Sequence, residues 1–155
     1  YNQSLHENVF VKENWTRRAC SYCTDSFRVK TLRTKDTMRN LIENTEKSLT
    51  ITGYSISDYL PKCSMLIIKK SQQGVYVRLY VNDTEKQKEV LDRLMSYRSR
   101  FLQIYEYQKQ EDDKMAALHA KLIVSDVKKS LVSSANLSYH GMQGNIEMGF
   151  LIESW

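Results

Sequence analysis

Several residues whose side chains suit phosphate chemistry lie close together in the last third of the chain. His119 and Lys121 are two positions apart, and Asp126 follows in the spacing H-x-K-x4-D. A short polar run, Ser133 to Asn136, comes next. An imidazole can attack or shuttle protons, an ammonium offsets charge on phosphate oxygens, and an amide donates a directed hydrogen bond. The spacing therefore indicates a site that processes phosphate groups.

A β-hairpin would bring these residues together. Side chains two apart in a strand project to the same face, so His119 and Lys121 share one. A two-residue loop at 127–128 would set Lys121 opposite Ser134. By the same count, His119 lies opposite Asn136. Because directly opposite residues of an antiparallel pair lie on one face, the hairpin is expected to gather all four into one polar patch.

This pattern closely resembles the HKD motif of the phospholipase D superfamily, whose fuller form is H-x-K-x4-D-x6-G-S-x-N. Ser133 departs from it, because the family has glycine there; serine has less backbone freedom, which affects the local turn rather than the chemistry. In single-motif nucleases of the family, a glutamate that supports the histidine lies eleven residues after the asparagine. Here that position is Glu147. A looser resemblance covers residues 31–83.

The resemblance implies catalysis without a metal or a cofactor. In the family the histidine attacks phosphorus and forms a phosphohistidine intermediate, which water then releases. The implied catalytic residues are those of the motif and its extension, namely His119, Lys121, Ser134, Asn136, Glu147 and, with a more structural role at the hairpin turn, Asp126. Substrate contacts are expected from Lys121, Asn136 and the turn residues Lys128 and Lys129.

The resemblance also implies a homodimer. In the family a second histidine protonates the leaving oxygen, and this chain carries one motif. Two copies of His119 are therefore expected to face each other across a shared cleft. His140 is an internal alternative, but it matches no catalytic position of the family and is interpreted as a loop residue.

The elements that must position the hairpin are predicted from hydrophobic periodicity. Thr34 is a plausible N-cap of a first helix, and a second helix stops at Gly74. Asn82-Asp83 is expected to cap a third helix, whose core face includes Met95. Strands are expected at about 49–53, 75–81, 101–107, 117–125, 130–135 and 146–152. Alternating helices and strands predict an α/β domain, and the resemblance makes it a phospholipase D-like sandwich with a mixed central β-sheet flanked by helices.

Composition sets the domain organisation. Residues 1–30 are polar and weakly periodic, so we expect an irregular N-terminal arm followed by a catalytic domain over 31–155. The chain begins with Tyr1 and ends on an apolar run, which suggests a piece of a longer chain. The apolar runs are too short for a membrane span. A net charge of +5 suits a polyanionic partner such as nucleic acid. Of the two nucleic acids, DNA is expected more than RNA.

The cysteines indicate the cellular compartment of the protein more than they indicate a metal site. Three is an odd number, which argues against a disulfide framework and favours a reducing cytoplasm. Cys20 and Cys23 have zinc-ligand spacing, and Cys63 or His6 could join them. A single CxxC is weak support for a metal site, so ordinary thiols are favoured.

Together these features predict a metal-independent phosphodiesterase of the nuclease type. One alternative is a phospholipid phosphodiesterase or transferase, disfavoured because nothing in the sequence resembles an interfacial helix or an exposed apolar face. Another is a nucleic-acid-binding module whose site has decayed, disfavoured because His119, Lys121, Asn136 and Glu147 are all present. A looser likeness points to phospholipase-D-like proteins of bacterial restriction and phage-defence systems. Strandedness of the substrate is left open.

Overall fold

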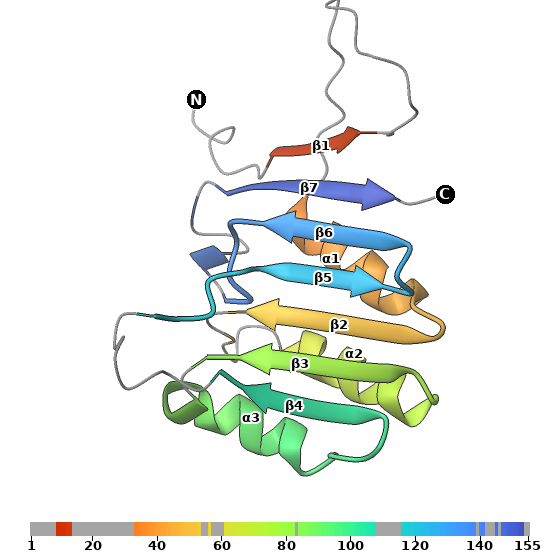
Figure 1. The fold of residues 1–155 in the computed structure, drawn as a ribbon, viewed down its shortest axis with the longest axis vertical. Helices are drawn as coiled ribbons and strands as arrows, with labels where there is room; N and C mark the ends of the chain where they lie inside the picture. The colour runs from red at the N-terminus through yellow and green to blue at the C-terminus, as the bar shows by residue number, and fades with distance from the viewer. Residues whose placement is uncertain are drawn as a thin grey trace, which may run out of the picture.

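The described residues form one mixed β-sheet of seven strands in the order β1-β7-β6-β5-β2-β3-β4 (Figure 1). The computed structural model describes residues 9–13 (backbone only), 33–53, 56, 61–82, 84–107, 116–138, 140–141, 145 and 147–153. The strands are β1 (Val9–Glu13), β2 (Ser48–Gly53), β3 (Tyr76–Val81), β4 (Leu102–Glu106), β5 (Leu122–Ser125), β6 (Lys129–Ser133) and β7 (Met148–Glu153). Strands β2, β3 and β4 are parallel, as are β1 and β7, whereas β5 and β6 pair antiparallel with their neighbours. The predicted mixed sheet is confirmed.

The helices lie together on one side of this sheet. They are α1 (Thr34–Asn44), α2 (Pro61–Gln72) and α3 (Lys88–Met95), with a short 3-10 turn η1 (Thr84–Gln87) before α3. Both crossovers, β2-α2-β3 and β3-α3-β4, advance in the same direction across the sheet, so right-handed connections put α2 and α3 on one face. Helix α1 packs against α2, and both lie behind the sheet in Figure 1.

The core fills the space between that face and the helices. Alternate residues of β2 and β3 are buried there, in the period-2 pattern of a strand with one covered face: Leu49, Ile51, Val77, Leu79 and Val81. The buried stripe of α1 meets them with Met38, Leu41 and Ile42. On the opposite face, which no described helix covers, side chains such as Tyr76, Tyr105 and Phe150 are exposed.

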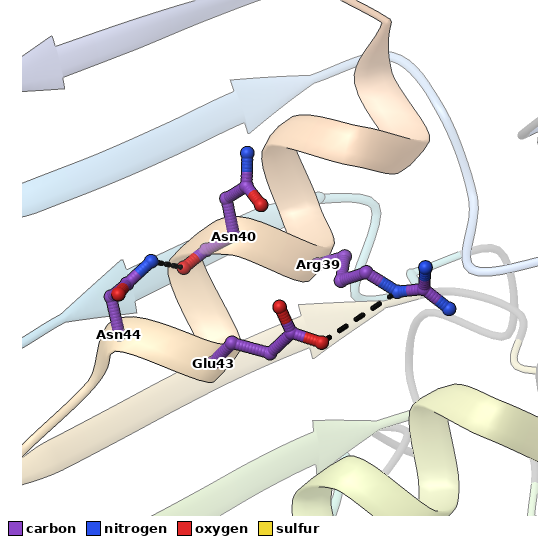
Figure 2. Close-up of polar contacts among 4 residues, drawn as sticks. All are labelled: Arg39, Asn40, Glu43 and Asn44. Atoms are coloured by element: carbon purple, nitrogen blue, oxygen red, sulfur yellow. Dashed lines mark hydrogen bonds and ion pairs between the residues drawn. The ribbon is translucent and has the colours of Figure 1, made fainter.

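The outward surface of α1 is polar and contributes little to stability (Figure 2). Arg39 and Glu43 form an ion pair of 3.8 Å across one turn, and the Asn44 amide donates to the Asn40 carbonyl at 2.7 Å. An exposed pair at this spacing is worth about 0.3–0.5 kcal/mol. The buried stripe of α1, rather than these contacts, therefore fixes the helix on the sheet.

The structure corrects three predictions about helices. Thr34 is the first residue of α1, not its N-cap, which is Arg33 without a side-chain hydrogen bond. Residues Asn82-Asp83 do not cap α3, because η1 intervenes. Met95 is 44% exposed, since it lies about 100° around the helix from the buried Leu94 and falls outside the core-facing stripe.

The N-terminal arm was predicted to be irregular, and this is wrong for residues 9–13. They form β1, which pairs in parallel with β7 at the edge of the sheet. The run Val9-Phe10-Val11 has high β-propensity, but a short segment becomes a strand only where a partner is available. That partner is more than a hundred residues away in sequence, so local periodicity could not identify it.

Asp126 joins the β5–β6 hairpin to the segment that enters β2. Its carboxylate accepts hydrogen bonds from the backbone N–H groups of Lys47 at 2.7 Å, Ser48 at 2.9 Å and Glu46 at 3.0 Å. Its own N–H donates to the Ser48 carbonyl at 2.8 Å. The structural contacts of Asp126 thus extend beyond its own turn to a loop about eighty residues earlier in the chain.

These hydrogen bonds also change the acidity of Asp126. Partial burial by itself raises the pKa of the carboxyl, but the hydrogen bonds from Ser48, Glu46 and Lys47, together with the charge of Lys128, outweigh it and hold the pKa below its usual range. A lowered folded-state pKa stabilises the fold above the unfolded-state pKa, near 3.9, and this contribution is lost as pH falls through the folded value.

We therefore expect Asp126→Asn to reduce the free energy of unfolding at neutral pH by about 1–3 kcal/mol, because a charged acceptor of several backbone N–H groups is lost. The difference from the unsubstituted protein should begin to narrow below about pH 4, where the carboxyl of the unfolded chain becomes protonated, and should vanish once the pH is below the lowered folded-state pKa. Urea unfolding at both pH values measures this. Asp92→Asn, at an exposed position of α3, is the control and should change little. Equal stability of the Asp126 variant at neutral pH would contradict the anchoring role.

Candidate active site

The residues of the H-x-K segment lie at the open end of the β5–β6 hairpin. His119 is exposed and Lys121 half-buried, both in the irregular segment 116–121 that precedes β5. The Lys121 ammonium donates to the His119 carbonyl oxygen at 2.8 Å. The prediction of a strand over 117–125 was too long, since β5 begins at Leu122.

Thr52, near the end of β2, fixes the backbone on both sides of Lys121. Its hydroxyl donates to the Ala120 carbonyl at 2.8 Å and accepts from the Leu122 N–H at 3.1 Å. One side chain thereby replaces two ladder hydrogen bonds at the point where β5 starts. A threonine in this place lets the chain leave the regular sheet without unpaired backbone groups around Lys121.

The register of the hairpin differs by one residue from the prediction. Ser125 pairs with Lys129, so the turn spans three residues, and the Ser133 N–H donates to the Lys121 carbonyl at 3.0 Å. Lys121 is therefore opposite Ser133 and not Ser134. A shift of one residue exchanges the two faces of a strand, so Ser134 does not share a face with Lys121.

The turn itself explains the shift. Asp126 and Val127 adopt positive φ angles of 54° and 57°, and the Lys128 N–H closes the turn onto the Ser125 carbonyl at 3.0 Å. A β-branched residue such as Val127 rarely adopts this conformation. The hydrogen bonds from residues 46–48 hold Asp126 outside the ladder, and this constraint is not visible in the local sequence.

Ser134 holds Glu147 instead. The Ser134 hydroxyl donates to the Glu147 carboxylate, and the Asn145 amide donates to its other oxygen at 3.2 Å. The backbone joins the same segments, because the Ser134 N–H donates to the Met148 carbonyl at 2.9 Å. Glu147 is thus placed at the start of β7, at the same end of the sheet as the H-x-K segment.

Asn136 is fixed by a close approach of Gly141. A Cβ at position 141 would lie 2.3 Å from the carbonyl oxygen of Asn136 and 2.6 Å from its nitrogen. The loop can fold back onto Asn136 only because Gly141 has no side chain. The Oδ1 atom of Asn136 is buried and accepts no hydrogen bond from the described residues. The backbone of Asn136 therefore packs directly against Gly141.

The next residue, Leu137, ties this segment to the parallel strands. It forms an isolated bridge with Ile56, whose N–H donates to the buried Gln87 side chain at 2.7 Å. The Gln87 amide in turn donates to the carbonyl of Asn82, just after β3. One buried glutamine therefore connects the ends of two parallel strands to the segment that carries Asn136.

Ser133, where the family pattern has glycine, does not strain the turn. It is not among the residues with positive φ, and its hydroxyl accepts from the Ala135 N–H at 3.0 Å. It also donates to the Met148 carbonyl at 3.3 Å. The backbone at this position requires no glycine, so the departure from the pattern has a local compensation.

Lys128 and Lys129 lie at the other end of the hairpin. Four strand residues separate them from Lys121, roughly 13 Å at the usual rise per residue. Lys129 pairs with Glu153 at 3.4 Å. A cleft of about 480 Å³ runs between α1 and this turn, and its lining includes both lysines and Asp126 but neither His119 nor Lys121. The turn lysines therefore do not belong to the cluster at the open end.

The remaining candidates are placed as follows. His140 is exposed, and its carbonyl accepts from the Asn145 N–H at 2.7 Å, in the loop between β6 and β7. Cys63 is buried on α2, and burial raises the pKa of its thiol to about 12, which opposes the thiolate that a metal ligand requires. Cys20, Cys23 and His6 lie outside the described residues. Among the described residues, no group of three His, Cys, Asp or Glu side chains could hold a metal ion.

The sequence of the chain matches a known family. A sequence model of the family described as cardiolipin synthase, PLD-like domain, matches residues 38–155. The chain belongs to this family. The phospholipase D-like fold expected from the HKD pattern is therefore confirmed, and its mixed sheet is the one described above.

Individual relatives agree with this assignment. The phospholipase D-like chain is 30% identical over 126 residues to the DISARM protein DrmC of Bacillus paralicheniformis. The match covers 80% of this chain and 51% of the relative, so the chain spans about half the length of that protein. Among the described residues, no helix is long and apolar enough to cross a membrane.

Two solved structures have the same fold. NucT from Helicobacter pylori superposes with a TM-score of 0.59 at 18% identity, covering 73% of this chain and 74% of that one. Nuc from Salmonella typhimurium, described as a phospholipase D family member, superposes with a TM-score of 0.60 at 17% identity, covering 77% and 75%. At this level of identity the likeness establishes the phospholipase D-like architecture.

Sequence reasoning missed the residues that support the site. Thr52, Gln87 and Gly141 belong to none of the predicted motif positions, yet they position Lys121 and Asn136. For Gly141 the sequence held a signal, since a glycine five positions after the motif asparagine indicates a close backbone approach. Thr52 and Gln87 act over long sequence distances, and no local pattern distinguishes them.

We expect Gly141→Ala to displace Asn136, because a Cβ there overlaps its carbonyl oxygen. The free energy of unfolding should fall by about 1–3 kcal/mol, the usual range for overpacking. Urea unfolding measures this, and the amide chemical shift of Asn136 reports the displacement. Gly53→Ala is the matched control, since a Cβ at 53 would meet the Leu137 side chain at an ordinary 3.7 Å. Similar losses in both variants, with an unchanged Asn136 amide, would contradict the positioning role.

Proposed function

We propose that the chain is the catalytic domain of a metal-independent phosphodiesterase that cleaves nucleic acid, with DNA as the favoured substrate and RNA as the alternative. The observation that supports this most is the convergence of the motif segments. The segment with His119 and Lys121, the segment from Ser134 to Asn136, and Glu147 all meet at one end of the sheet. In the proposal, a nucleophile, a cation, an amide and a carboxylate from these segments act on one phosphate group.

In the proposed reaction, His119 attacks phosphorus through an imidazole nitrogen. A nitrogen–phosphorus bond forms and the bond to the leaving oxygen breaks, while Lys121 and Asn136 bind the non-bridging oxygens. Water then attacks the phosphohistidine, releasing a phosphate monoester and regenerating His119. Glu147, held by Ser134 and Asn145, would accept a hydrogen bond from the N–H of the other imidazole nitrogen and so fix the tautomer.

The leaving oxygen needs a proton, and the motif supplies one histidine. We therefore propose a homodimer in which His119 of each copy serves as acid for the other across a twofold axis. Because His119 is exposed at the end of the sheet, a second chain can reach it without rearrangement of the core. The same histidine then takes a proton from the attacking water in the second step.

Two features favour nucleic acid as the substrate: the net positive charge of the chain and its similarity to the DISARM protein. The net charge of +5 attracts a polyanion. The DISARM relative fits a role in a bacterial restriction or phage-defence system, and hence a cytoplasmic location. The family description, cardiolipin synthase, keeps phospholipid as the alternative substrate. A decayed binding module is disfavoured because His119, Lys121 and Asn136 are all retained.

We expect the protein to cleave DNA in the presence of EDTA, because Lys121 and Asn136 supply the charge and hydrogen bonds that a divalent ion would otherwise provide. Labelled single- and double-stranded DNA, RNA and phospholipid vesicles should be compared under identical conditions. His119→Ala and Lys121→Ala should abolish turnover, and Asn136→Ala should reduce it on the order of 10²-fold. Lys88→Ala, at an exposed position of α3, is the matched control for removal of a positive charge.

Loss of cleavage on chelation, with rescue by magnesium, would refute the proposed mechanism. Cleavage of phospholipid alone would replace nucleic acid as the substrate while leaving the reaction class intact. Sedimentation of the active sample should give a dimer. Full activity in a sample that sediments as a monomer would exclude the shared cleft.

The covalent step makes a separate prediction. A phosphoramidate on His119 is stable in base, so quenching turnover with alkali should leave labelled substrate on the peptide containing Leu118 to Lys121. The label should persist in His140→Ala and be absent from His119→Ala. Two displacements retain the configuration at a chiral phosphorothioate, whereas direct attack by water inverts it. Net inversion in the product of a single cleavage would reduce His119 to a general base.

A further inference from the structure

A group of aromatic and basic side chains occupies the exposed face of β3 and β4. We propose that this tyrosine–arginine patch, formed by Tyr76, Arg78, Tyr80, Phe101 and Tyr105, binds unpaired bases of a single-stranded nucleic acid. The proposal rests on the proposed nuclease function and specifies its substrate as single-stranded. No residue of the patch belongs to the HKD pattern or to the segments that support it.

The register of the two strands brings the aromatic rings together in pairs. Tyr80 pairs with Tyr105, and their rings stack with centroids 5.0 Å apart and planes 16° from parallel. Four residues earlier on β3, Tyr76 meets Phe101 at 4.9 Å, with the ring planes tilted by 50°. The side chains of Tyr76 and Tyr105 are 52% and 42% exposed. Such rings offer exposed π-faces, and every base has a π-face to place against them.

Basic side chains lie among these rings, where a nucleic-acid backbone would pass. Arg78 stands on the same face between Tyr76 and Tyr80 and is exposed. The guanidinium of Arg100 lies over the Phe101 ring at 4.7 Å from its centroid. Stacking rings with adjacent cations are the combination used to bind single strands without sequence preference. In a duplex the bases are stacked on each other and cannot reach the rings.

The composition of the patch argues for nucleic acid against an apolar partner. The rest of the same sheet face, over β6 and β7, carries aliphatic and aromatic side chains without interleaved cations: Val132, Met148, Phe150 and Ile152. A protein or lipid surface would favour that apolar half. Only the half over β3 and β4 alternates rings with arginines, and the charge of a phosphate backbone complements it.

The patch is also continuous with the candidate active site. Tyr80 pairs with Thr52, and Thr52 pairs with Leu122, the residue after Lys121. Adjacent strands are about 4.8 Å apart, so the patch begins roughly 10 Å from the segment that carries the reactive residues. A single strand held on the rings can therefore continue to the end of the sheet, where the phosphate would be cleaved.

Binding should be measured by fluorescence anisotropy of a labelled oligothymidylate, with His119→Ala in every sample so that no cleavage occurs. Adding Tyr80→Ala or Tyr105→Ala should each weaken binding about tenfold, the usual loss for one stacked base, and leave duplex affinity unchanged. Arg78→Gln should lower the salt slope of the affinity by about 0.7, the value for one phosphate of a single strand. Tyr97→Ala, an exposed tyrosine that follows α3, is the matched control and should bind normally.

Two further measurements guard against a folding defect. Tyr105→Leu keeps apolar bulk at the exposed edge and should still weaken binding. Ultraviolet crosslinking of the His119→Ala protein to the same oligonucleotide should label peptides containing Tyr76 to Tyr80 or Phe101 to Tyr105. Crosslinks found only elsewhere would overturn the proposal.

Unchanged oligonucleotide affinity in both tyrosine variants would also overturn it. Cleavage of DNA by the unsubstituted protein in that case would leave the nuclease function standing. If the tyrosine variants bind the oligonucleotide more weakly but the unsubstituted protein cleaves no nucleic acid, the patch stands as a binding surface and the nuclease function is refuted. A change in sedimentation without a change in oligonucleotide affinity would make the patch a protein interface and refute base stacking.

Discussion

The carboxylate of Asp126 and the backbone N–H groups of residues 46–48 set the relation between the hairpin and the parallel strands. This contact holds Asp126 out of the ladder, so the turn spans three residues and Ser125 pairs with Lys129. From that register follows the position of Lys121 opposite Ser133. A carboxylate with several N–H donors is strong enough to impose this, even though Val127 must adopt an unfavourable positive φ.

The candidate site depends on a set of supports that are mostly hydrogen bonds between side chains and the backbone. Thr52 replaces ladder hydrogen bonds around Lys121, Gly141 allows a loop to press against Asn136, and Gln87 ties two strand ends together. Ser134, which the pattern assigned to the reactive cluster, instead holds Glu147. Rigid placement of this kind is what a phosphoryl-transfer site requires, because catalysis there depends mainly on positioning and electrostatic stabilisation.

The two faces of the sheet are used differently. One is buried under α1, α2 and α3 and supplies the hydrophobic core, while the other presents exposed side chains to its surroundings. The same β-sheet thus provides the hydrophobic core that stabilises the fold and an exposed surface next to the candidate active site. The proposed base-binding patch and the proposed catalytic cluster would then share one strand, β2, as their common support.

The sequence by itself determined the elements whose signal is local. The H-x-K-x4-D spacing identified the motif, the alternation over 75–81 identified β3, and the stripe of Met38, Leu41 and Ile42 identified α1. Only the tertiary structure decided the hairpin register, the pairing of β1 with β7, and the residues that support Lys121 and Asn136. Side-chain periodicity depends on a few neighbouring residues, whereas these features depend on hydrogen bonds and close approaches between segments far apart in the chain.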